Sequence, residues 1–460
     1  MRPIRTLLAL AVLPLALAAP AVAAPQTTAA PTVEEQRLDR AAPQEILRRS
    51  GFDDVAPDFA RALSRVRSAA EAERVITREG RAVWRRAVDR AQGRGPAGGD
   101  LSRGDDRPLY WARLGMTRAL GQWRPGFPLT DARRAALLRT LERTSRGQDS
   151  IDLPAGRHVK RIVVTGFDPF QLDADVRRSN PSGAAALALD GTTIRTDDGP
   201  ARIETVVFPV RWADFAEGTV ERTLLPAFRP GPRRVDAFMT LSQGRAGRFD
   251  VERTNGAWRG GYPDNANVSR TETVPIPAGV PTPHPQPQWT TTTLPYQRIV
   301  AADTGPVPVY DNTTVTEIPA GATAPVVRSD GPTPGSTARA GGGGDYLSNE
   351  IAYRATLLRD AVGLKVPGGH LHTPVLQFGP GNTDPTTGQI TDPDFVHNRE
   401  TITAQVRSIL TVVVDTTPRS ASSRAKGPAG SRKRPCATAS IASPIDHHES
   451  LKSCSVGVSC

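Results

Sequence analysis

The chain has 460 residues, enough for two domains with linkers, and carries 58 lysines and arginines against 47 aspartates and glutamates, a formal net charge of +11. The arginines are spread along helical segments and the C-terminal stretch, without the interleaved aromatic residues that single-stranded nucleic-acid binders use. We therefore interpret the basic surplus as solvated surface and predict no nucleic-acid partner. All three cysteines lie after residue 435, so the body of the chain has no thiol nucleophile and no cysteine zinc site.

Residues 1–24 have the pattern of a secretory signal peptide. Arg2 and Arg5 precede an apolar run from Leu7 to Ala19, and Ala21-Val22-Ala23 is a small-x-small cleavage site. The run is too short for a good membrane span, which makes an uncleaved anchor the weaker alternative. We predict a secreted, extracellular protein that is cleaved near Ala23 and has no stable membrane span.

Residues 25–150 are predicted to form a linker followed by a helical extension of unknown role. Apolar residues recur at helical spacing in four segments, with Phe59 and Leu63 in the first and Leu137 and Leu141 in the last. No pattern in this region points to chemistry, so we interpret its aromatic residues as core.

Residues 158–415 alternate predicted strands with predicted helices. Ile203 to Val210 and Val235 to Leu241 are strand-like, whereas Ser182 to Leu189 and Asn349 to Val362 are helical. This alternation predicts an α/β domain with a largely parallel or mixed sheet that helices cover on both faces.

Two stretches interrupt or follow this domain. Residues 267–344 are rich in proline, threonine and glycine, and are predicted to be an insertion made mostly of loop. Residues 416–460 are basic and aperiodic, and are predicted to be a disordered tail. Cys436, Cys454 and Cys460 lie there, and their odd number leaves at least one thiol outside any internal disulfide.

The segment from Arg161 to Phe170 is typical of a buried strand that runs into a loop with two phenylalanines around a proline. Ile162 to Thr165 are apolar or β-branched, Gly166 ends the strand, and Asn180-Pro181-Ser182 follows. This pattern resembles the pyroglutamyl peptidase I family (pyrrolidone-carboxylate peptidases), in which a strand leads into a Gly-Phe-x-Pro-Phe loop and an Asn-Pro-Ser helix start. The family removes an N-terminal pyroglutamyl residue from peptides with a Cys-His-Glu triad.

A second match begins where a predicted strand ends at Leu241 and a glycine-rich loop presents Gln243. Glu252 and Arg253 follow, and Pro263-Asp264-Asn265 comes further on. The family has a Gln-Gly loop, a Glu-Arg pair and a Pro-Asp-Asn in this order, so the resemblance implies that Glu252 is the acidic member of a triad. From the residues alone, a glutamate beside an arginine at a strand edge is more often a surface ion pair.

A third match contains Gly344, Tyr346, Ser348, Asn349 and Tyr353. The family has Gly-x-Phe/Tyr-x-Cys-Asn with a later aromatic residue, and its catalytic cysteine opens a helix; here a serine stands at that position. A nucleophile at a helix N-terminus gains from the helix dipole and from free backbone N–H groups that can form an oxyanion hole. The alternative is that Ser348 is only the N-cap of the helix.

The fourth match is Gly369-His370-Leu371-His372-Thr373-Pro374. The family carries Gly-Phe-x-His-x-Pro here, which selects His372 rather than His370 as the triad base. On a strand the two imidazoles share one face, so a metal site is an alternative, although no nearby acidic residue or histidine has an obvious ligand spacing.

The resemblance covers about residues 160–415 and implies a three-layer α/β/α sandwich of the phosphorylase/hydrolase-like type, without cofactor or metal. It implies a hydrolase that acts on peptides with N-terminal pyroglutamate, and the signal-peptide pattern of residues 1–24 predicts that this hydrolase is exported. Ser348 would act as nucleophile, His372 as base and Glu252 as orienting acid, since Ser-His-acid triads work on several folds. A hydroxyl needs more help from its base than a thiol does, so a catalytically inactive binding protein that keeps the pocket is the alternative.

Substrate-binding residues are implied by the same resemblance. The family holds the flat lactam ring between aromatic side chains and reads its amide by hydrogen bonds. Phe167, Phe170 and Tyr346 match its aromatic residues, and Gln243 matches its amide-reading glutamine. Without the motif, the two phenylalanines could equally be ordinary core residues.

Overall fold

The structure is a computed structural model that describes residues 30–156, 158–196 and 199–417. The predicted signal peptide, the three cysteines and almost all of the predicted basic tail lie outside these residues. Within the described ranges, no helix combines the length and the apolar character needed to cross a membrane.

The N-terminal region is helical, as its apolar spacing predicts. Its elements are α1 (Val33–Gln36), the 3₁₀ turn η1 (Arg37–Asp39), α2 (Ala41–Ser50), α3 (Val55–Ser64), α4 (Ala69–Ala91), α5 (Arg107–Gln122) and α6 (Asp131–Thr144). Ser68 and Thr130 start α4 and α6 by accepting hydrogen bonds from the backbone N–H groups of Glu71 and Arg133.

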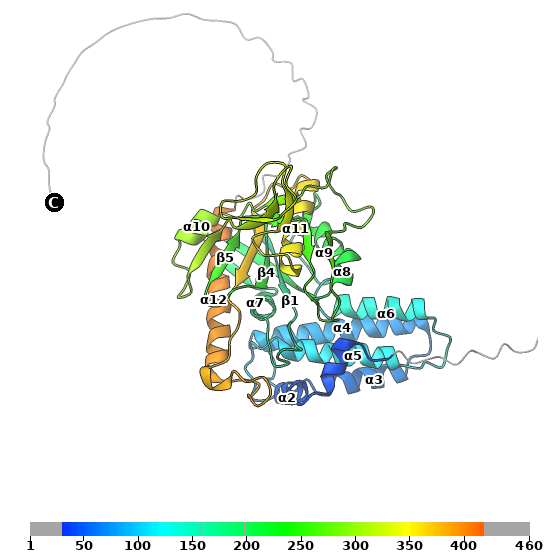
Figure 1. The fold of residues 1–460 in the computed structure, drawn as a ribbon. Helices are drawn as coiled ribbons and strands as arrows, with labels where there is room; N and C mark the ends of the chain where they lie inside the picture. Colours follow the sequence, from blue (N-terminus) through cyan, green and yellow to red (C-terminus); the bar gives the residue numbers. More distant parts are fainter. Residues whose placement is uncertain (1–29, 157, 197–198, 418–460) are drawn as a thin grey trace, which may run out of the picture. The chain divides into compact units, whose positions relative to one another are not determined.

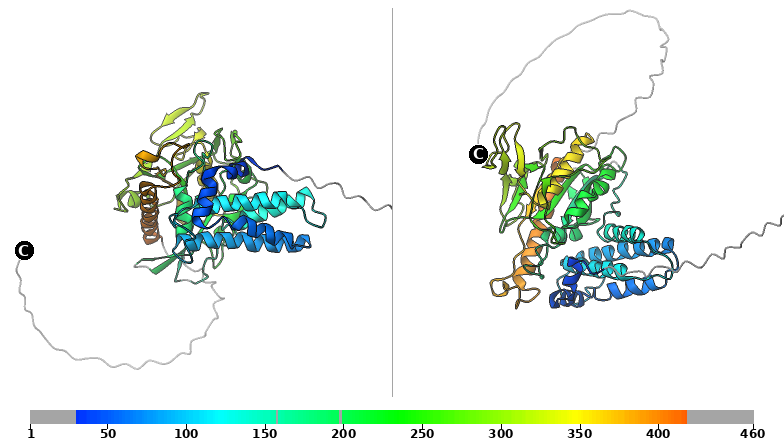
Figure 2. Two further views of the ribbon diagram at one scale, coloured as in Figure 1. Left: turned by 90° about the horizontal axis from the view of Figure 1, so that it is seen from below. Right: turned by 45° about the vertical axis from the view of Figure 1, so that its right-hand side comes forward.

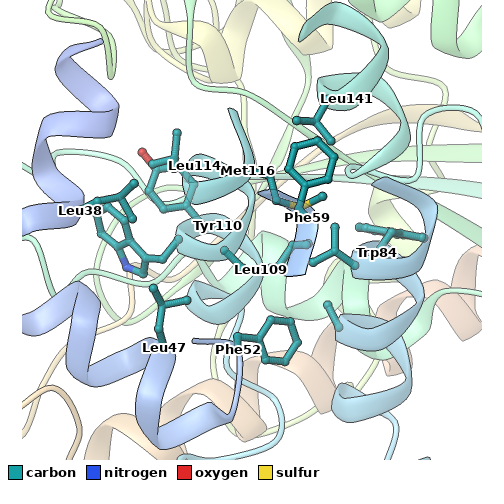
Figure 3. Packing of buried hydrophobic residues seen from close by; sticks show 14 of the residues in the cluster. Leu38, Leu47, Phe52, Phe59, Trp84, Leu109, Tyr110, Leu114, Met116 and Leu141 are labelled. Carbon is teal, nitrogen blue, oxygen red and sulfur yellow. The ribbon is translucent and has the colours of Figure 1, made fainter. Parts of the chain in front are cut away.

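These helices pack on one another around a shared apolar core (Figures 2 and 3). Phe59 and Leu63, which the sequence places on one helical face, are each 1% exposed, and Leu141 is fully buried. The same core cluster extends to Leu187 and Val207 of the following domain. The helical region and the α/β domain therefore share buried apolar contacts.

The α/β domain is built on a mixed sheet of seven strands in the order β10-β5-β14-β4-β1-β3-β2. The strands are β1 (Lys160–Phe167), β2 (Thr193–Thr196), β3 (Gly199–Phe208), β4 (Ala237–Gln243), β5 (Phe249–Glu252), β10 (Val309–Asn312) and β14 (Gly368–Thr373). The four central strands β14, β4, β1 and β3 are parallel, whereas β5 and β2 run antiparallel to their neighbours β14 and β3.

Helices cover both faces of this sheet, because successive residues of a buried strand point to opposite sides. Ile162 and Val164 pack with α7 (Pro181–Leu189) and α12 (Pro393–Thr416), while Val163 packs with α8 (Trp212–Ala216), α9 (Thr219–Phe228) and α11 (Leu347–Ala361). In Figure 1, α12 and the pair α8–α9 lie on opposite sides of the strands labelled β5, β4 and β1. The predicted three-layer α/β/α class with a helical extension is thus confirmed.

The segment predicted as loop, residues 267–344, carries more regular structure than its composition indicates. It contains β8 (Thr271–Thr273), β9 (Trp289–Thr291), α10 (Tyr296–Ala301), β10, β11 (Val315–Ile318), β12 (Val326–Arg328) and β13 (Thr337–Ala340). Short strands β6 (Thr254–Gly256) and β7 (Trp258–Gly260) pair with β9 and β8, and β11 to β13 form a small antiparallel sheet. A further 3₁₀ turn, η2 (Pro380–Asn382), precedes α12. Because β10 pairs with β5, the insertion supplies the edge strand of the main sheet.

Candidate active site

The candidate site lies where the parallel strands β1, β4 and β14 reach their carboxyl ends. In open α/β sheets this edge is where ligands bind. Strand β1 ends at Phe167, and strands β4 and β14 end together, with Gln243 paired to Thr373 and Ser242 paired to His372. Three of the residues that the motifs single out, Phe167, Gln243 and His372, therefore share one edge of the sheet.

His372 and Glu252 form a buried pair on adjacent strands. The ring Nδ1 of His372 lies 2.7 Å from Glu252 Oε1, and the two residues are 6% and 1% exposed. Strand β5 runs antiparallel to β14 with Glu252 opposite His370, so the pair is a diagonal neighbour on one face of the sheet. Arg253 instead pairs with Asp311 at 3.0 Å, so the interpretation of Glu252 as a surface ion pair is wrong.

Asn312 holds the second oxygen of the Glu252 carboxylate. Its Nδ2 donates to Glu252 Oε2 at 2.8 Å and to the carbonyl of Gly342 at 3.0 Å. The register of β10 against β5 sets Asn312 beside Glu252. Sequence reasoning missed Asn312 because it belongs to the insertion, where no motif marks it.

The glycines that end the insertion allow the backbone to approach the pair closely. A Cβ on Gly342 would lie 2.1 Å from Glu252 Oε2, and a Cβ on Gly343 would lie 3.1 Å from His372 Cε1. On another side of the ring, a Cβ on Gly244 would lie 2.7 Å from His372 Cβ. Larger residues at 342 and 244 would therefore displace the acid or the imidazole.

Ser348 is the second residue of α11, and the N-cap of this helix is Tyr346 in an extended conformation. The interpretation of Ser348 as the N-cap is therefore wrong. Its hydroxyl donates to the carbonyl of Gly343 at 3.0 Å, the same glycine that borders the His372 ring. The backbone N–H groups of the first helical turn lack intrahelical partners, so this serine is next to free donors of the kind that stabilise an oxyanion.

Polar contacts fix the start of α11. The side-chain oxygen of Asn349 accepts from Gly256 N at 2.9 Å and its Nδ2 donates to Gly256 O at 2.8 Å. Glu350 accepts two hydrogen bonds from the buried guanidinium of Arg259, at 2.6 and 2.7 Å. The two residues that follow Ser348 are thus tied to β6 and β7, which limits how far Ser348 can move.

A cavity of about 40 Å³ adjoins Ser348. Its lining residues are largely aromatic, apolar or neutral polar: Phe167, Phe170, Asn180, Val210, Ser242, Gln243, Tyr346, Leu347 and Ser348. All four residues that the resemblance implies for substrate binding lie in this lining. The alternative that Phe167 and Phe170 are only core residues does not account for their position at the cavity.

Tyr346 is the centre of an aromatic group beside the cavity. Its ring centroid lies 5.9 Å from that of Phe170, 5.2 Å from that of Trp212 and 5.4 Å from that of Tyr262. Its hydroxyl donates to the carbonyl of Pro263 at 3.1 Å, and burial raises the pKa of this phenol. Tyr346 is therefore a neutral, fixed wall of the cavity.

His370 is held in a separate polar chain. Its Nδ1 and Nε2 lie 2.8 Å from Thr240 Oγ1 and Ser242 Oγ, and the residue is fully buried outside the cavity lining. Burial, and secondarily the neighbouring His372, hold its pKa well below the usual range, so His370 is neutral. Sequence reasoning missed Ser242, which joins this histidine to the cavity wall.

The metal alternative for the two histidines has little support from their contacts. Both nitrogens of His370 are engaged by hydroxyl groups, and one nitrogen of His372 is engaged by Glu252. Among the described residues, no group of three or more histidines, cysteines, aspartates or glutamates is arranged to hold a metal ion.

The fold and the site together define a three-layer α/β/α protein with a buried His–Glu pair and a serine beside a small aromatic cavity. Sequence models described as the PA0049 N-terminal domain and the PA0049 C-terminal domain match residues 16–142 and residues 161–284 and 308–377. The uncharacterized protein PA0049 of Pseudomonas aeruginosa strain PAO1 is 35% identical, over 83% of this chain and 89% of its own length. The chain belongs to the PA0049 family.

Solved structures of pyrrolidone carboxyl peptidases match somewhat more than half of the chain at low similarity. A mutant enzyme from Pyrococcus furiosus is 20% identical with a TM-score of 0.36, over 55% of this chain and 98% of its own. The enzyme from Thermococcus litoralis is 17% identical with a TM-score of 0.37, over 57% and 98%. Pyroglutamyl peptidase I from Bacillus amyloliquefaciens is 19% identical with a TM-score of 0.34, over 56% and 98%.

Proposed function

We propose that this protein is an exported peptidase that removes N-terminal pyroglutamate from peptides through Ser348, His372 and Glu252. The observation that carries the proposal is the buried contact of 2.7 Å between His372 Nδ1 and Glu252, next to an aromatic cavity that Ser348 lines. A carboxylate on Nδ1 keeps the proton on that nitrogen and leaves Nε2 to act as a base. The signal-peptide pattern of residues 1–24 supports secretion.

In the proposed reaction, the Ser348 hydroxyl turns from the Gly343 carbonyl to His372 Nε2 and attacks the pyroglutamyl carbonyl. His372 takes the hydroxyl proton and then gives it to the departing amine as the C–N bond breaks. Water, deprotonated by His372, then hydrolyses the acyl-serine and releases pyroglutamate. Glu252 stabilises the imidazolium in both steps, and free N–H groups at the start of α11 stabilise the oxyanion.

The cavity favours a small neutral ring. None of the described residues that line it carries a charge, so it offers no carboxylate to pair with the ammonium group of an ordinary N-terminal residue. The faces of Phe170 and Tyr346 suit a flat lactam, and the amide of Gln243 can hydrogen-bond its N–H or C=O group. A blocked pyroglutamyl end fits these features better than a free N-terminus.

The second candidate is a binding protein that keeps the pocket without turnover. The observation that favours it is the Ser348 hydroxyl, which donates to Gly343 O at 3.0 Å. If that bond persisted with ligand bound, His372 would not activate the serine. A hydroxyl, unlike a thiol, has no reactive anionic form available near neutral pH.

One pair of measurements separates the two candidates. Purified protein is given a pyroglutamyl-aminocoumarin substrate, with alanyl-aminocoumarin as a control, and free L-pyroglutamate is titrated by calorimetry. The peptidase proposal expects coumarin release from the first substrate only, lost in Ser348→Ala while pyroglutamate still binds. Binding without release in the unmodified protein would support the second candidate, and neither binding nor release would overturn both.

A further inference from the structure

The helical region contacts several of the loops that line or border the cavity, and the first contact is made by Arg37 in η1. This side chain is 4% exposed, forms bonds of 2.8 and 2.7 Å to both oxygens of Asp173, and donates to the carbonyl of Asn265 at 2.6 Å. Asn265 in turn donates its side-chain amide to Pro169 O at 2.8 Å and its backbone N–H to Val210 O at 3.0 Å. Arg37 thereby holds the residue that joins two stretches of the cavity wall.

The second contact is an ion pair beneath the Phe167–Phe170 loop. Arg113 of α5 donates to Asp168 Oδ2 at 3.0 Å, and Arg146, which follows α6, donates to the same oxygen. Asp168 is buried and lies directly after Phe167. Two arginines of the helical region therefore fix the loop between the cavity's phenylalanines.

The third contact is made by Asp106, the residue before α5. Its carboxylate accepts from the backbone N–H of Asn180 at 2.9 Å and from the hydroxyl of Ser179. Asn180 lines the cavity, and its Nδ2 donates to Asp168 O at 2.9 Å, which joins this contact to the second one. Asp106 therefore sets the position of a polar group in the cavity wall.

We propose that the helical region is a positioning element for the cavity, which acts through Arg37, Asp106 and the Arg113–Asp168 ion pair. None of these helical-region residues lines the cavity. Each of them therefore acts through a loop residue that lines the cavity or that lies next to a lining residue. The role concerns the order of the loops and applies whether the site performs catalysis or only binds. It gives the helical region a function in the site.

The chain offers a matched control in Arg90. This arginine is 3% exposed, and its hydrogen bonds go to the carbonyls of Ala97, Leu101, Ser102 and Arg103, all within the helical region. Removal of Arg90 damages the same region without breaking any of the cavity-loop contacts described above. A general loss of helical stability and a loss of loop positioning can thus be told apart.

The test compares full-length Arg37→Ala and Arg90→Ala by amide hydrogen exchange. The positioning role predicts that peptides covering residues 167–180 and 262–268 exchange at least about 10-fold faster in Arg37→Ala, because a buried charged hydrogen-bond partner is lost. In Arg90→Ala the increase should be confined to residues 90–103. Equal protection of the cavity loops in both variants would overturn the inference.

A further variant and a binding measurement complete the test of the positioning role. Asp173→Ala removes the same ion pair from the half-exposed partner, so it reports on the contact if Arg37→Ala does not fold. Affinity for L-pyroglutamate should weaken roughly 10-fold in Asp173→Ala and Arg37→Ala, and less than about twofold in Arg90→Ala. If the unmodified protein does not bind pyroglutamate, the proposed ligand is wrong, and the exchange comparison alone confirms or overturns the positioning role.

Discussion

Replacement of Glu252 by glutamine tests how the acid acts on His372. The carboxylate accepts from two sides at once, from His372 Nδ1 at 2.7 Å and from Asn312 Nδ2 at 2.8 Å. A glutamine has one oxygen and one NH₂ group, so it can satisfy only one of these donors. If the amide NH₂ faces His372, the ring must carry its proton on Nε2 and cannot take one from Ser348.

The expected loss is large because a wrong tautomer removes the base altogether. When the acid of a Ser-His-acid triad is neutralised without loss of shape, kcat falls by about 10⁴-fold, which corresponds to about 5 kcal/mol of transition-state stabilisation. We expect a decrease of about 10³- to 10⁴-fold in kcat for Glu252→Gln. Affinity for pyroglutamate should change little, because Glu252 does not line the cavity.

The assay is coumarin release from pyroglutamyl-aminocoumarin, with calorimetry of pyroglutamate binding alongside. The matched control is Asp311→Asn on the same strand as Asn312, since Asp311 only forms a half-exposed ion pair with Arg253. The control should retain kcat within about twofold. A folded Glu252→Gln protein with kcat close to the unmodified value would refute the role of Glu252 as the orienting acid.

Three further predictions concern neighbouring groups. Asn312→Ala should lower kcat about 10-fold to 100-fold, since it removes one hydrogen bond to the buried carboxylate of Glu252; unchanged kcat in the coumarin assay would refute it. Ser348→Cys should gain or raise activity, because a thiol needs less help from the base; a folded variant that binds pyroglutamate without turnover would mean that the Ser348–His372 geometry is unproductive. Burial lowers the pKa of His370, so below about pH 6.5 the unfolded chain binds a proton that the folded chain does not. The free energy of unfolding should therefore fall as the pH falls, by up to about 2 kcal/mol between pH 7 and pH 5. His370→Gln should flatten that part of the slope in urea unfolding, and an unchanged slope would contradict the assignment.

The fold class was predictable because its signals are local. The buried strand at Ile162 to Thr165 and the helical spacing of Phe59 and Leu63 each depend on residues close in sequence. The order of the motifs also predicted which glutamate and which histidine to consider, and the structure brings Glu252 and His372 into contact.

Other features could not be predicted from sequence because they depend on distant contacts. Asn312 reaches Glu252 only through the pairing of β10 with β5. The periodicity of the sequence does not predict the register of that pairing. The N-cap fell on Tyr346 rather than Ser348 since serine preference at caps is statistical and packing decides the boundary. The contact of Arg37 with Asp173 joins residues from two regions, and neither residue has a sequence signal for the other.

The most direct test of the central claim is to trap the nucleophile. A diphenyl phosphonate that carries the pyroglutamyl ring reacts irreversibly with an activated serine hydroxyl, and the site of the adduct can be read by mass spectrometry of proteolytic peptides. We predict one adduct per chain, on Ser348, that forms equally well after iodoacetamide treatment, is absent in Ser348→Ala and is strongly slowed in Glu252→Gln. An adduct on Ser242 or on a tail cysteine, or no adduct in a protein that hydrolyses the coumarin substrate, would contradict the assignment of Ser348.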